Sequence, residues 1–491
     1  MEADKPFDAL IIGSGIGGLS TGIILSRLHH RVAVIEKNPL PGGLMRNYVR
    51  EGVDCPVGVH YFGAFGEGQP LRRMFDYLGV AVAAERMGQG GPIDRYLFDD
   101  FTFDLPEGID AFAEALDASF PEDRQPIAAI IANLRILAEQ QNSLTFLSSV
   151  AIPLLDMDLF SPLSVYLTKL NCSRRLRGVL SVASSWMGLS EHECPVFYHH
   201  LALTSYLMSA WRLRGGGSDL AEAFTSRLQG LGGSLICNDR AVAILAEGRD
   251  VAGVRLASGR ELRVNRVVAA IHPKAVLAML PEEAVQPRHA RRIRGLAETV
   301  GLFSASVVLD GRTHPALPHN IYRLHTDREG WISEGVFYQL RAGRGGKSLL
   351  TMITNSPFSE WLRWEETTTG RRGPDYHEEK IRRAGVLLRK AEEVFGSLAG
   401  AKIIDAYTPL TLRDWVNSPE GSPYGIMRSA RQLPAATVLH RPPLGGLFFA
   451  GQNALAPGIL GTVLGSFQAV RQMIGYDRFV PVFEDLLKLP G

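Results

Sequence analysis

Along this chain, apolar runs long enough for a buried strand alternate with segments of helical periodicity, and glycine turns separate them. The first apolar run covers Phe7 to Ile12, and a second covers Arg31 to Ile35 and ends at Glu36. Between them, a glycine-rich turn precedes a segment with an apolar side at helical spacing, formed by Leu19, Ile23, Leu25 and Leu28. The pattern predicts a strand, a turn, a helix and a second strand.

A similar pattern recurs between residues 212 and 238, in the middle of the chain. It predicts a glycine turn, a helix whose N-cap is Ser218 or Asp219, and a strand. Short strands joined by turns at Gly248 and Gly259 follow, which predicts a small meander.

Two longer insertions separate these segments. In the first, residues 106–140 have helical periodicity with acidic residues early in the segment. In the second, residues 301–310 and 347–355 alternate between apolar and polar positions, as strands do.

The most apolar part of the chain lies between residues 142 and 168. No charge occurs from Gln140 to Leu155, but Pro153 and Pro162 interrupt the segment. No stretch reaches the roughly 18 uninterrupted apolar residues that a membrane span requires. The pattern favours buried lid helices over an apolar pocket; a surface that dips into a membrane to collect a lipid is the alternative.

Composition and charge indicate a well-buried globular protein. The chain has 491 residues, 46% of them hydrophobic, which is too long for one simple core and predicts two interleaved domains. A net charge of +1 gives no reason to expect a nucleic-acid partner. The basic cluster from Arg288 to Gly295 is interpreted as a solvated helix face, and contact with lipid headgroups is the alternative.

The chain has four scattered cysteines, Cys55, Cys172, Cys194 and Cys237. Their spacing fits neither a disulfide framework nor a metal site and is typical of a reducing compartment. His192, His199 and His200 lie near Cys194 in the sequence, but they match no zinc pattern, so we expect no metal. Because the first strand begins almost at once, we expect no signal peptide and a cytoplasmic protein, with peripheral membrane contact as an open alternative.

The turn after the first strand has GxGxxG spacing. Its candidate nucleotide-binding residues are Gly13, Ser14, Gly15, Ile16, Gly17 and Gly18. Gly13 permits a tight turn, Gly15 lets a pyrophosphate approach the backbone, and Gly18 lets the helix pack closely on the strand. Free N–H groups at the helix N-terminus would face the phosphates. The Glu36 carboxylate, at the end of the second strand, can bind both ribose hydroxyls.

These residues alone leave NAD and FAD open. The extension from Glu36 to Gly43 favours FAD, because a second glycine pair offers more bare backbone to a longer dinucleotide. Further candidate contacts here are Lys37, Gly42, Gly43, Leu44 and Arg46, of which Arg46 fits a surface role equally well. The whole pattern resembles the dinucleotide-binding motif of FAD-containing amine oxidases and phytoene desaturases, which implies FAD as the cofactor.

A second glycine-punctuated turn, from Gly446 to Phe467, completes the same nucleotide site. An apolar strand, LFFA, precedes it, and a helix is expected to begin near Leu460. The positive end of that helix would point toward the flavin ring and favour reduced, anionic flavin. The candidate cofactor contacts are Gly451, Gln452, Asn453, Pro457, Gly458, Ile459 and Gly461.

Residues 41–80, with GVHYFG at Gly58 to Gly63, are similar to the retinol saturase and carotenoid isomerase branch of the phytoene desaturase family. Residues 101–116 and 408–426 and the closing motif extend this similarity over nearly the whole chain. The resemblance adds Gly58, Val59 and His60 as cofactor contacts, and Val242 as a backbone contact of the adenine.

The predicted fold class is α/β. It consists of a Rossmann-like FAD-binding domain of the amine oxidase and phytoene desaturase type, interleaved with an α+β substrate domain. The nucleotide-domain patterns occupy residues 1–66, 213–275 and 405–475. The substrate domain, with its apolar helical lid, is predicted from residues 67–212 and 276–404.

Members of the family reduce, desaturate or isomerise carbon–carbon double bonds of long apolar polyenes, chiefly carotenoids and retinoids. The resemblance implies an FAD-dependent oxidoreductase acting on such a substrate, and GVHY favours saturation by flavin hydride transfer. A saturase also needs an acid that protonates the second carbon. His60, Tyr61 and Tyr424 are the candidates, and a packing role is the alternative for each.

Several other functions stay open at this point. They are a carotenoid desaturase or cis–trans isomerase, a reductive cyclase of a polyene natural product, an amine oxidase, and a non-catalytic prenyl-chain binder. NAD(P)H or another electron donor is expected as a partner, although the sequence contains no second dinucleotide fingerprint.

Overall fold

The computed structural model describes residues 6–148 and 157–489. A five-stranded parallel sheet forms the centre of the predicted nucleotide-binding domain, in the order β10-β2-β1-β14-β20. Its strands are β1 (Ala9–Ile12), β2 (Val32–Ile35), β10 (Ser234–Ile236), β14 (Val267–Ala269) and β20 (Leu447–Phe449). Every residue of β1 and β2 is buried, which accounts for their uninterrupted apolar sequences. The predicted strand–helix–strand order at the start of the chain is confirmed.

Helix α1 (Ile16–Arg27) packs between two helices that are distant in sequence, α9 (Gly217–Gly230) and α15 (Gly458–Ile474). The predicted N-cap of α9 is wrong, because the helix begins at Gly217, before both Ser218 and Asp219. A Cβ atom on Gly217 would lie 1.7 Å from the carbonyl oxygen of Met45, so glycine allows this helix end to meet the chain there. The Ser218 hydroxyl instead accepts a hydrogen bond from the backbone N–H of Asn47.

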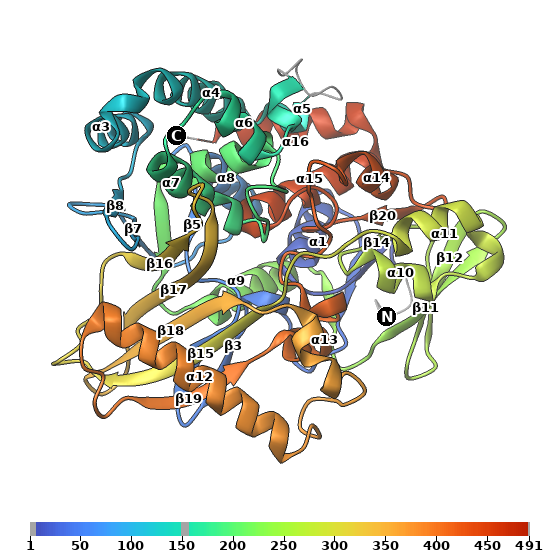
Figure 1. The fold of residues 1–491 in the computed structure, drawn as a ribbon. Coiled ribbons are helices and arrows are strands. Elements are labelled where there is room, and N and C mark those ends of the chain that lie inside the picture. Colours follow the sequence, from blue (N-terminus) through green and yellow to red (C-terminus); the bar gives the residue numbers. More distant parts are fainter. Residues whose placement is uncertain (1–5, 149–156, 490–491) are drawn as a thin grey trace.

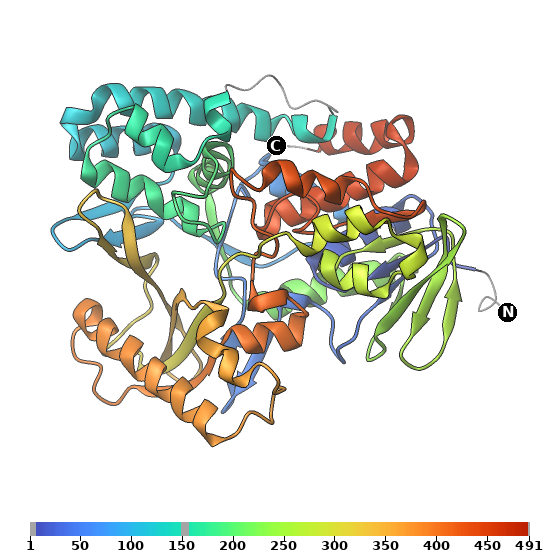
Figure 2. The same cartoon turned by 45° about the vertical axis from the view of Figure 1, so that its right-hand side comes forward.

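The predicted meander is present as three antiparallel strands beside the nucleotide domain. They are β11 (Ala241–Glu247), β12 (Asp250–Leu256) and β13 (Glu261–Arg263). Figure 2 shows this meander and helices α10 (Pro273–Met279) and α11 (Pro287–Arg294) at one side of the molecule.

A seven-stranded mixed sheet forms the second domain, in the order β19-β15-β18-β17-β16-β7-β8. Both predicted strands of the second insertion are confirmed, as the neighbours β15 (Leu302–Asp310) and β18 (Lys347–Asn355). The others are β7 (Asp94–Leu97), β8 (Thr102–Leu105), β16 (Asn320–Thr326), β17 (Ile332–Ala342) and β19 (Lys402–Tyr407). Helix α12 (Pro374–Phe395) covers one face (Figure 1), and its buried residues join those of the sheet in one apolar cluster.

A helical lobe lies at the other end of the second domain (Figures 1 and 2). The helical pattern predicted for residues 106–140 is confirmed and forms two helices, α3 (Ile109–Ser119) and α4 (Arg124–Asn142). The lobe also contains α5 (Thr145–Ser148), α6 (Leu163–Lys169), α7 (Arg174–Ser185) and α8 (Val196–Met208). The middle of the predicted apolar lid, residues 149–156, lies outside the described residues.

The remaining elements are shorter or connect these layers. They are β3 (Asn47–Arg50), β4 (Val53–Pro56), β5 (Phe62–Gly63), α2 (Pro70–Leu78), β6 (Ala84–Arg86), β9 (Ala210–Leu213), α13 (Pro409–Val416), α14 (Leu433–Ala436) and α16 (Tyr476–Lys488). No helix within residues 6–148 and 157–489 is both long and apolar enough to cross a membrane.

Candidate active site

A cavity of about 1580 Å³ connects the nucleotide domain with the second domain. Its wall contains both glycine motifs at one end and aromatic side chains of the second domain at the other. Ligand sites commonly have volumes of roughly 300–1,000 Å³, so this cavity has room for a dinucleotide and a second molecule.

The first glycine turn forms part of the cavity wall, and its glycines have different surroundings. Nothing lies within 4 Å of a Cβ atom placed on Gly15, so the bare backbone there faces open space. A Cβ atom on Gly17 would lie 2.6 Å from the Cα atom of Gly451, which brings the two glycine motifs together. Gly18 does not line the cavity, and a Cβ atom there would lie 1.8 Å from the carbonyl oxygen of Gly13.

Glu36 is buried at the wall of this end of the cavity. Its Oε2 atom accepts hydrogen bonds from the N–H and hydroxyl of Ser14. Its Oε1 atom accepts bonds from the N–H (2.8 Å) and amide group of Asn38. The carboxylate therefore holds the glycine turn on the end of β2.

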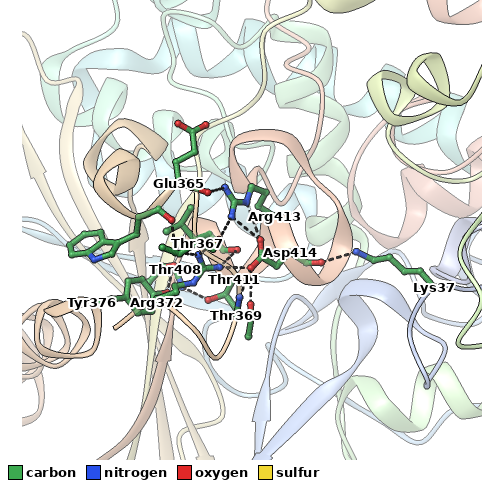
Figure 3. Close-up of polar contacts among 12 residues, drawn as sticks. Lys37, Glu365, Thr367, Thr369, Arg372, Tyr376, Thr408, Thr411, Arg413 and Asp414 are labelled. Atoms are coloured by element: carbon green, nitrogen blue, oxygen red, sulfur yellow. Dashed lines mark hydrogen bonds and ion pairs between the residues drawn. The ribbon is translucent and has the colours of Figure 1, made fainter. Parts of the chain in front are cut away.

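Helix α13 forms part of the cavity wall, and Figure 3 shows the polar contacts of its residues Arg413 and Asp414. Lys37 Nζ donates to the carbonyl oxygen of Asp414 at 2.7 Å, and burial lowers the pKa of this lysine. The Asp414 carboxylate accepts bonds from the N–H (2.8 Å) and hydroxyl (2.9 Å) of Thr369 and pairs with buried Arg372. Arg413 lines the cavity and donates to the carbonyl oxygens of Glu365 and Thr367.

The second glycine pair also reaches the cavity. Gly42, Gly43 and Leu44 line it, whereas Arg46 does not. The Arg46 guanidinium donates to the carbonyl oxygens of Leu40 and Gly43 and lies 5.7 Å from the centre of the Trp415 ring. In this arrangement Arg46 fastens the chain next to the site.

The closing motif presents the N-terminus of α15 to the same cavity. The helix begins at Gly458, two residues before the expected position, and Pro457 at its N-cap makes no side-chain bond to the first turn. Gly451, Gln452, Pro457, Gly458, Ile459 and Gly461 all line the cavity. Free N–H groups and the positive end of the helix dipole therefore face the ligand space, which suits an electron-rich group.

Asn453 ties a further segment to this motif. Its Oδ1 atom accepts the N–H of Ile426 at 2.9 Å, and its carbonyl oxygen accepts a bond from buried Arg428. Arg428 lines the cavity and makes no ion pair within the described part of the chain. Gln452 Nε2 donates to the carbonyl oxygen of Pro423, next to Tyr424.

Aromatic side chains surround the other end of the cavity. His60, Tyr61 and Tyr424 all line it, together with Trp186, Tyr206, Tyr322 and Phe337. Burial, with a smaller contribution from Arg341, lowers the pKa of His60 to about 4, so its imidazole is neutral at neutral pH. Burial raises the pKa of Tyr424 to about 12. Gly58 and Val59 line the cavity beside His60, and Val242 lines it from β11.

Asp94, which lies behind this end of the cavity, is one of three residues here that the sequence did not indicate, with Tyr322 and Trp186. It is 0% exposed on β7, and its Oδ2 atom lies 2.9 Å from the Tyr61 hydroxyl. The signal available in the sequence was an acidic residue at the start of a strand-like DRYL segment, and many exposed strands contain one. Tyr322 and Trp186 were missed because they lie on β16 and at the end of α7, far in sequence from the GVHYFG motif, and no local pattern connects them with it.

The histidines near Cys194 are engaged with the protein itself. His199 Nε2 bonds to the carbonyl oxygen of Leu180 at 2.6 Å, and the Nδ1 atoms of His199 and His200 lie 2.9 Å apart. Within residues 6–148 and 157–489, no group of three or more metal-ligating side chains is arranged to bind an ion.

Comparison with known proteins finds distant relatives of this chain. The profile of the NAD(P)-binding Rossmann-like domain matches residues 11–78. The all-trans-retinol 13,14-reductase of Macaca fascicularis is 24% identical, over 94% of this chain and 84% of its own length. The prolycopene isomerase of Daucus carota is 21% identical, over 99% of this chain and 84% of its own length. The 4,4'-diapophytoene desaturase of Methylomonas sp is 26% identical over 53% of this chain and 52% of its own.

Two solved structures show the same fold. An oxidoreductase from Methanosarcina mazei has a TM-score of 0.66 at 16% identity, covering 94% of this chain and 99% of its own. The cyclohexylamine oxidase from Brevibacterium oxydans has a TM-score of 0.60 at 19% identity, and the match covers 98% of this chain and 100% of the oxidase. At this identity, the likeness concerns the fold alone.

The fold is a Rossmann-like dinucleotide domain combined with a mixed α/β domain, as in oxidoreductases of the amine oxidase type, and the sequence relatives indicate an oxidoreductase. The sequence relatives confirm the predicted resemblance to the phytoene desaturase, retinol saturase and carotenoid isomerase family.

Proposed function

We propose that this protein is an FAD-dependent oxidoreductase that saturates a carbon–carbon double bond of a long apolar polyene or isoprenoid. The observation that supports this proposal most directly is one cavity. Its wall contains the bare backbone of both glycine motifs and, at the other end, aromatic side chains that include tyrosine hydroxyls. The relatives that match over most of their length, a retinol reductase and a prolycopene isomerase, support a polyene substrate.

The residues present fit FAD. The open space at Gly15 would be filled by a side chain on any other residue, so this position suits a pyrophosphate close to the backbone. Glu36 would hold the ribose, Val242 would contact the adenine, and the α15 N-terminus would face the ring. When bound, FAD supplies hydride transfer.

The chain's own residues bind and orient the apolar substrate and supply the proton. Trp186, Tyr206 and Phe337 form apolar surface against which a conjugated chain can pack. His60 is neutral at neutral pH, so its imidazolium form is not available as an acid. Of the two tyrosines, we favour Tyr61 over Tyr424 as the proton donor for the carbon that receives no hydride, because the Tyr61 hydroxyl bonds to the Asp94 carboxyl.

The test begins with an absorbance spectrum of the purified protein. It continues with anaerobic mixing with NADPH and then with a retinoid or carotenoid. We expect flavin bands that bleach with NADPH, return with the polyene, and accompany a product two mass units heavier, because two hydrogens are added.

Other outcomes would replace this proposal. Bleaching by the polyene alone would identify a desaturase, and an unchanged product mass with an altered double-bond geometry would identify an isomerase. A protein that binds no flavin and cannot be reconstituted would favour the prenyl-chain binder.

A further inference from the structure

The Asp94 carboxyl group lies directly behind the aromatic wall of the cavity. Its Oδ1 atom accepts a bond from Asn320 Nδ2 at 2.8 Å, and its Oδ2 atom faces the Tyr61 hydroxyl. Arg212 is buried nearby, but it bonds to Asn320 Oδ1 and the carbonyl oxygen of Leu317 rather than to Asp94. Asp94 makes no ion pair in the part of the chain that the structure describes. A buried carboxyl without a cationic partner favours the protonated form.

A continuous row of hydrogen bonds extends from this carboxyl along the cavity. The Tyr61 and Tyr322 hydroxyls lie 2.9 Å apart, and Trp186 Nε1 donates to the Tyr322 oxygen at 3.0 Å. Tyr61, Tyr322 and Trp186 all line the cavity, whereas Asp94 does not. Tyr61 is only partly buried because its ring faces this space.

The number of protons in this row depends on Asp94. The row has three contacts, Trp186 to Tyr322, Tyr322 to Tyr61, and Tyr61 to Asp94. With Asp94 ionised, the indole N–H and the two hydroxyl protons fill these three contacts, and none is directed elsewhere. With Asp94 protonated, four protons share three contacts. One tyrosine hydroxyl is then free to donate into the cavity.

The surroundings set the pH at which this change occurs. Burial raises the pKa of Asp94 to about 7, although bonds from Asn320 and Tyr61 and the charge of Arg212 oppose that shift. Burial and the neighbouring Asp94 raise the pKa of Tyr61 well above its usual value. A Tyr61 phenolate is therefore unstable unless another group replaces the lost proton at once.

Other titratable groups around Asp94 cannot take over this role. The phenols Tyr96, Tyr206 and Tyr322 have pKa values raised by burial. The charged groups beyond Asn320 are Arg212, Arg341 and, on the surface, Glu85. Asp94 is thus the carboxyl in direct contact with the tyrosine row.

We propose that Asp94 is the positioning residue and proton reserve for Tyr61 during reduction of the double bond. This inference rests on the proposed function. One alkene carbon takes a hydride, with its two electrons, from reduced flavin. The other forms a C–H bond as the Tyr61 O–H bond breaks. The Asp94 carboxyl returns a proton to the Tyr61 oxygen and is later protonated again by water.

Four variants of the flavin-loaded protein test this arrangement. The saturation rate of the wild type should fall as the pH rises through about 7, because ionised Asp94 leaves no free hydroxyl proton. D94N and Y61F should lower this rate by about 10²–10⁴-fold and lose the pH dependence. Y322F should keep the pH dependence, because Tyr61 and Asp94 still share one contact. D104N is the matched control, since it removes an exposed carboxylate on neighbouring β8 that pairs with Arg95.

A second readout needs no turnover. Infrared spectra of the flavin-free protein should contain the C=O band of a buried carboxylic acid that disappears as the pH rises through about 7. The band should persist in D104N and be missing in D94N.

The outcomes separate the two proposals. A wild type that reduces polyenes while D94N retains the same rate and pH profile overturns the Asp94 inference alone, as does a carboxyl band unaffected by D94N. A wild type that reduces no polyene overturns the proposed function and, with it, the role of Asp94 in reduction. The carboxyl band would still show whether Asp94 holds a proton.

Discussion

Gly15 is the N-cap of α1 and Gly18 lies three residues later inside that helix, and an added methyl group would meet different surroundings at each. At Gly15 it would project into open space, whereas at Gly18 it would overlap the carbonyl oxygen of Gly13. The first glycine therefore leaves room for a ligand, and the second allows α1 to pack on the turn.

We predict that G15A folds normally but binds FAD more weakly, because the methyl group occupies the space of the pyrophosphate. G18A should lower the free energy of unfolding by about 1–3 kcal/mol or more, since the backbone must shift. Thermal unfolding of the flavin-free proteins and flavin titration measure the two effects. A G15A protein with wild-type affinity for FAD would contradict this assignment of the site.

Asp94 illustrates how one residue depends on contacts from distant strands. Its partners Tyr61 and Asn320 are 33 and 226 positions away in the sequence. The raised pKa follows from burial, so it is a property of the packed sheet and not of the DRYL segment itself.

Helix α13 links the second domain to the nucleotide end of the cavity. The Asp414 carboxylate is its main anchor, bonded to Thr369 and paired with Arg372, whose side chain is 3% exposed. Burial opposes ionisation of Asp414, but the bonds from Thr369 and the charge of Arg372 prevail and lower its pKa.

We predict that D414A destabilises the protein by about 3–5 kcal/mol, because it leaves the Arg372 charge buried without a partner. FAD should also bind more weakly, because loss of the carboxylate anchor lets α13 shift, and with it the backbone carbonyl of residue 414 that accepts the bond from Lys37. Thermal unfolding with and without FAD measures both effects. D310A removes the exposed partner of Arg312 and should leave the melting midpoint unchanged.

The pH dependence of this anchor follows from the lowered pKa. Its contribution is present above the ordinary aspartate pKa of about 4 and is lost as the pH falls through the lower folded value. The difference in stability between wild type and D414A should therefore shrink in acid. A difference that stays constant down to pH 3 would contradict the ion pair.

At the scale of the whole molecule, α11 gives the surface a concentrated positive charge. Ala290 and Ile293 are buried, and the arginines at 288, 291, 292 and 294 are exposed. This agrees with the predicted solvated helix face and leaves contact with lipid headgroups as a prediction.

We predict that the protein sediments with anionic vesicles at low salt, because each arginine near such a surface contributes about 1 kcal/mol. R291E/R292E should weaken this binding by at least about tenfold. R371E/R389E changes the charge equally at exposed positions elsewhere and serves as the control. Equal losses in both variants, or no sedimentation of the wild type, would contradict a lipid contact through α11.

The sequence by itself determined the nucleotide-binding domain and the two glycine motifs. These depend on local rules, since glycine spacing, apolar runs and helix periodicity act within a few residues of the chain. The βαβ start, the meander and the strands of the second insertion therefore follow from sequence patterns. GVHYFG also predicted the resemblance to the phytoene desaturase, retinol saturase and carotenoid isomerase family, which the sequence relatives confirm.

Only the tertiary structure decided how distant segments meet. It placed Arg46 outside the cavity, started α9 at Gly217 beside Met45, and brought Asp94, Tyr61 and Tyr322 into one hydrogen-bonded row. The physical reason is that these features arise from close packing and burial between segments far apart in the chain. Burial changes the protonation of a carboxyl group, and no local spacing encodes it.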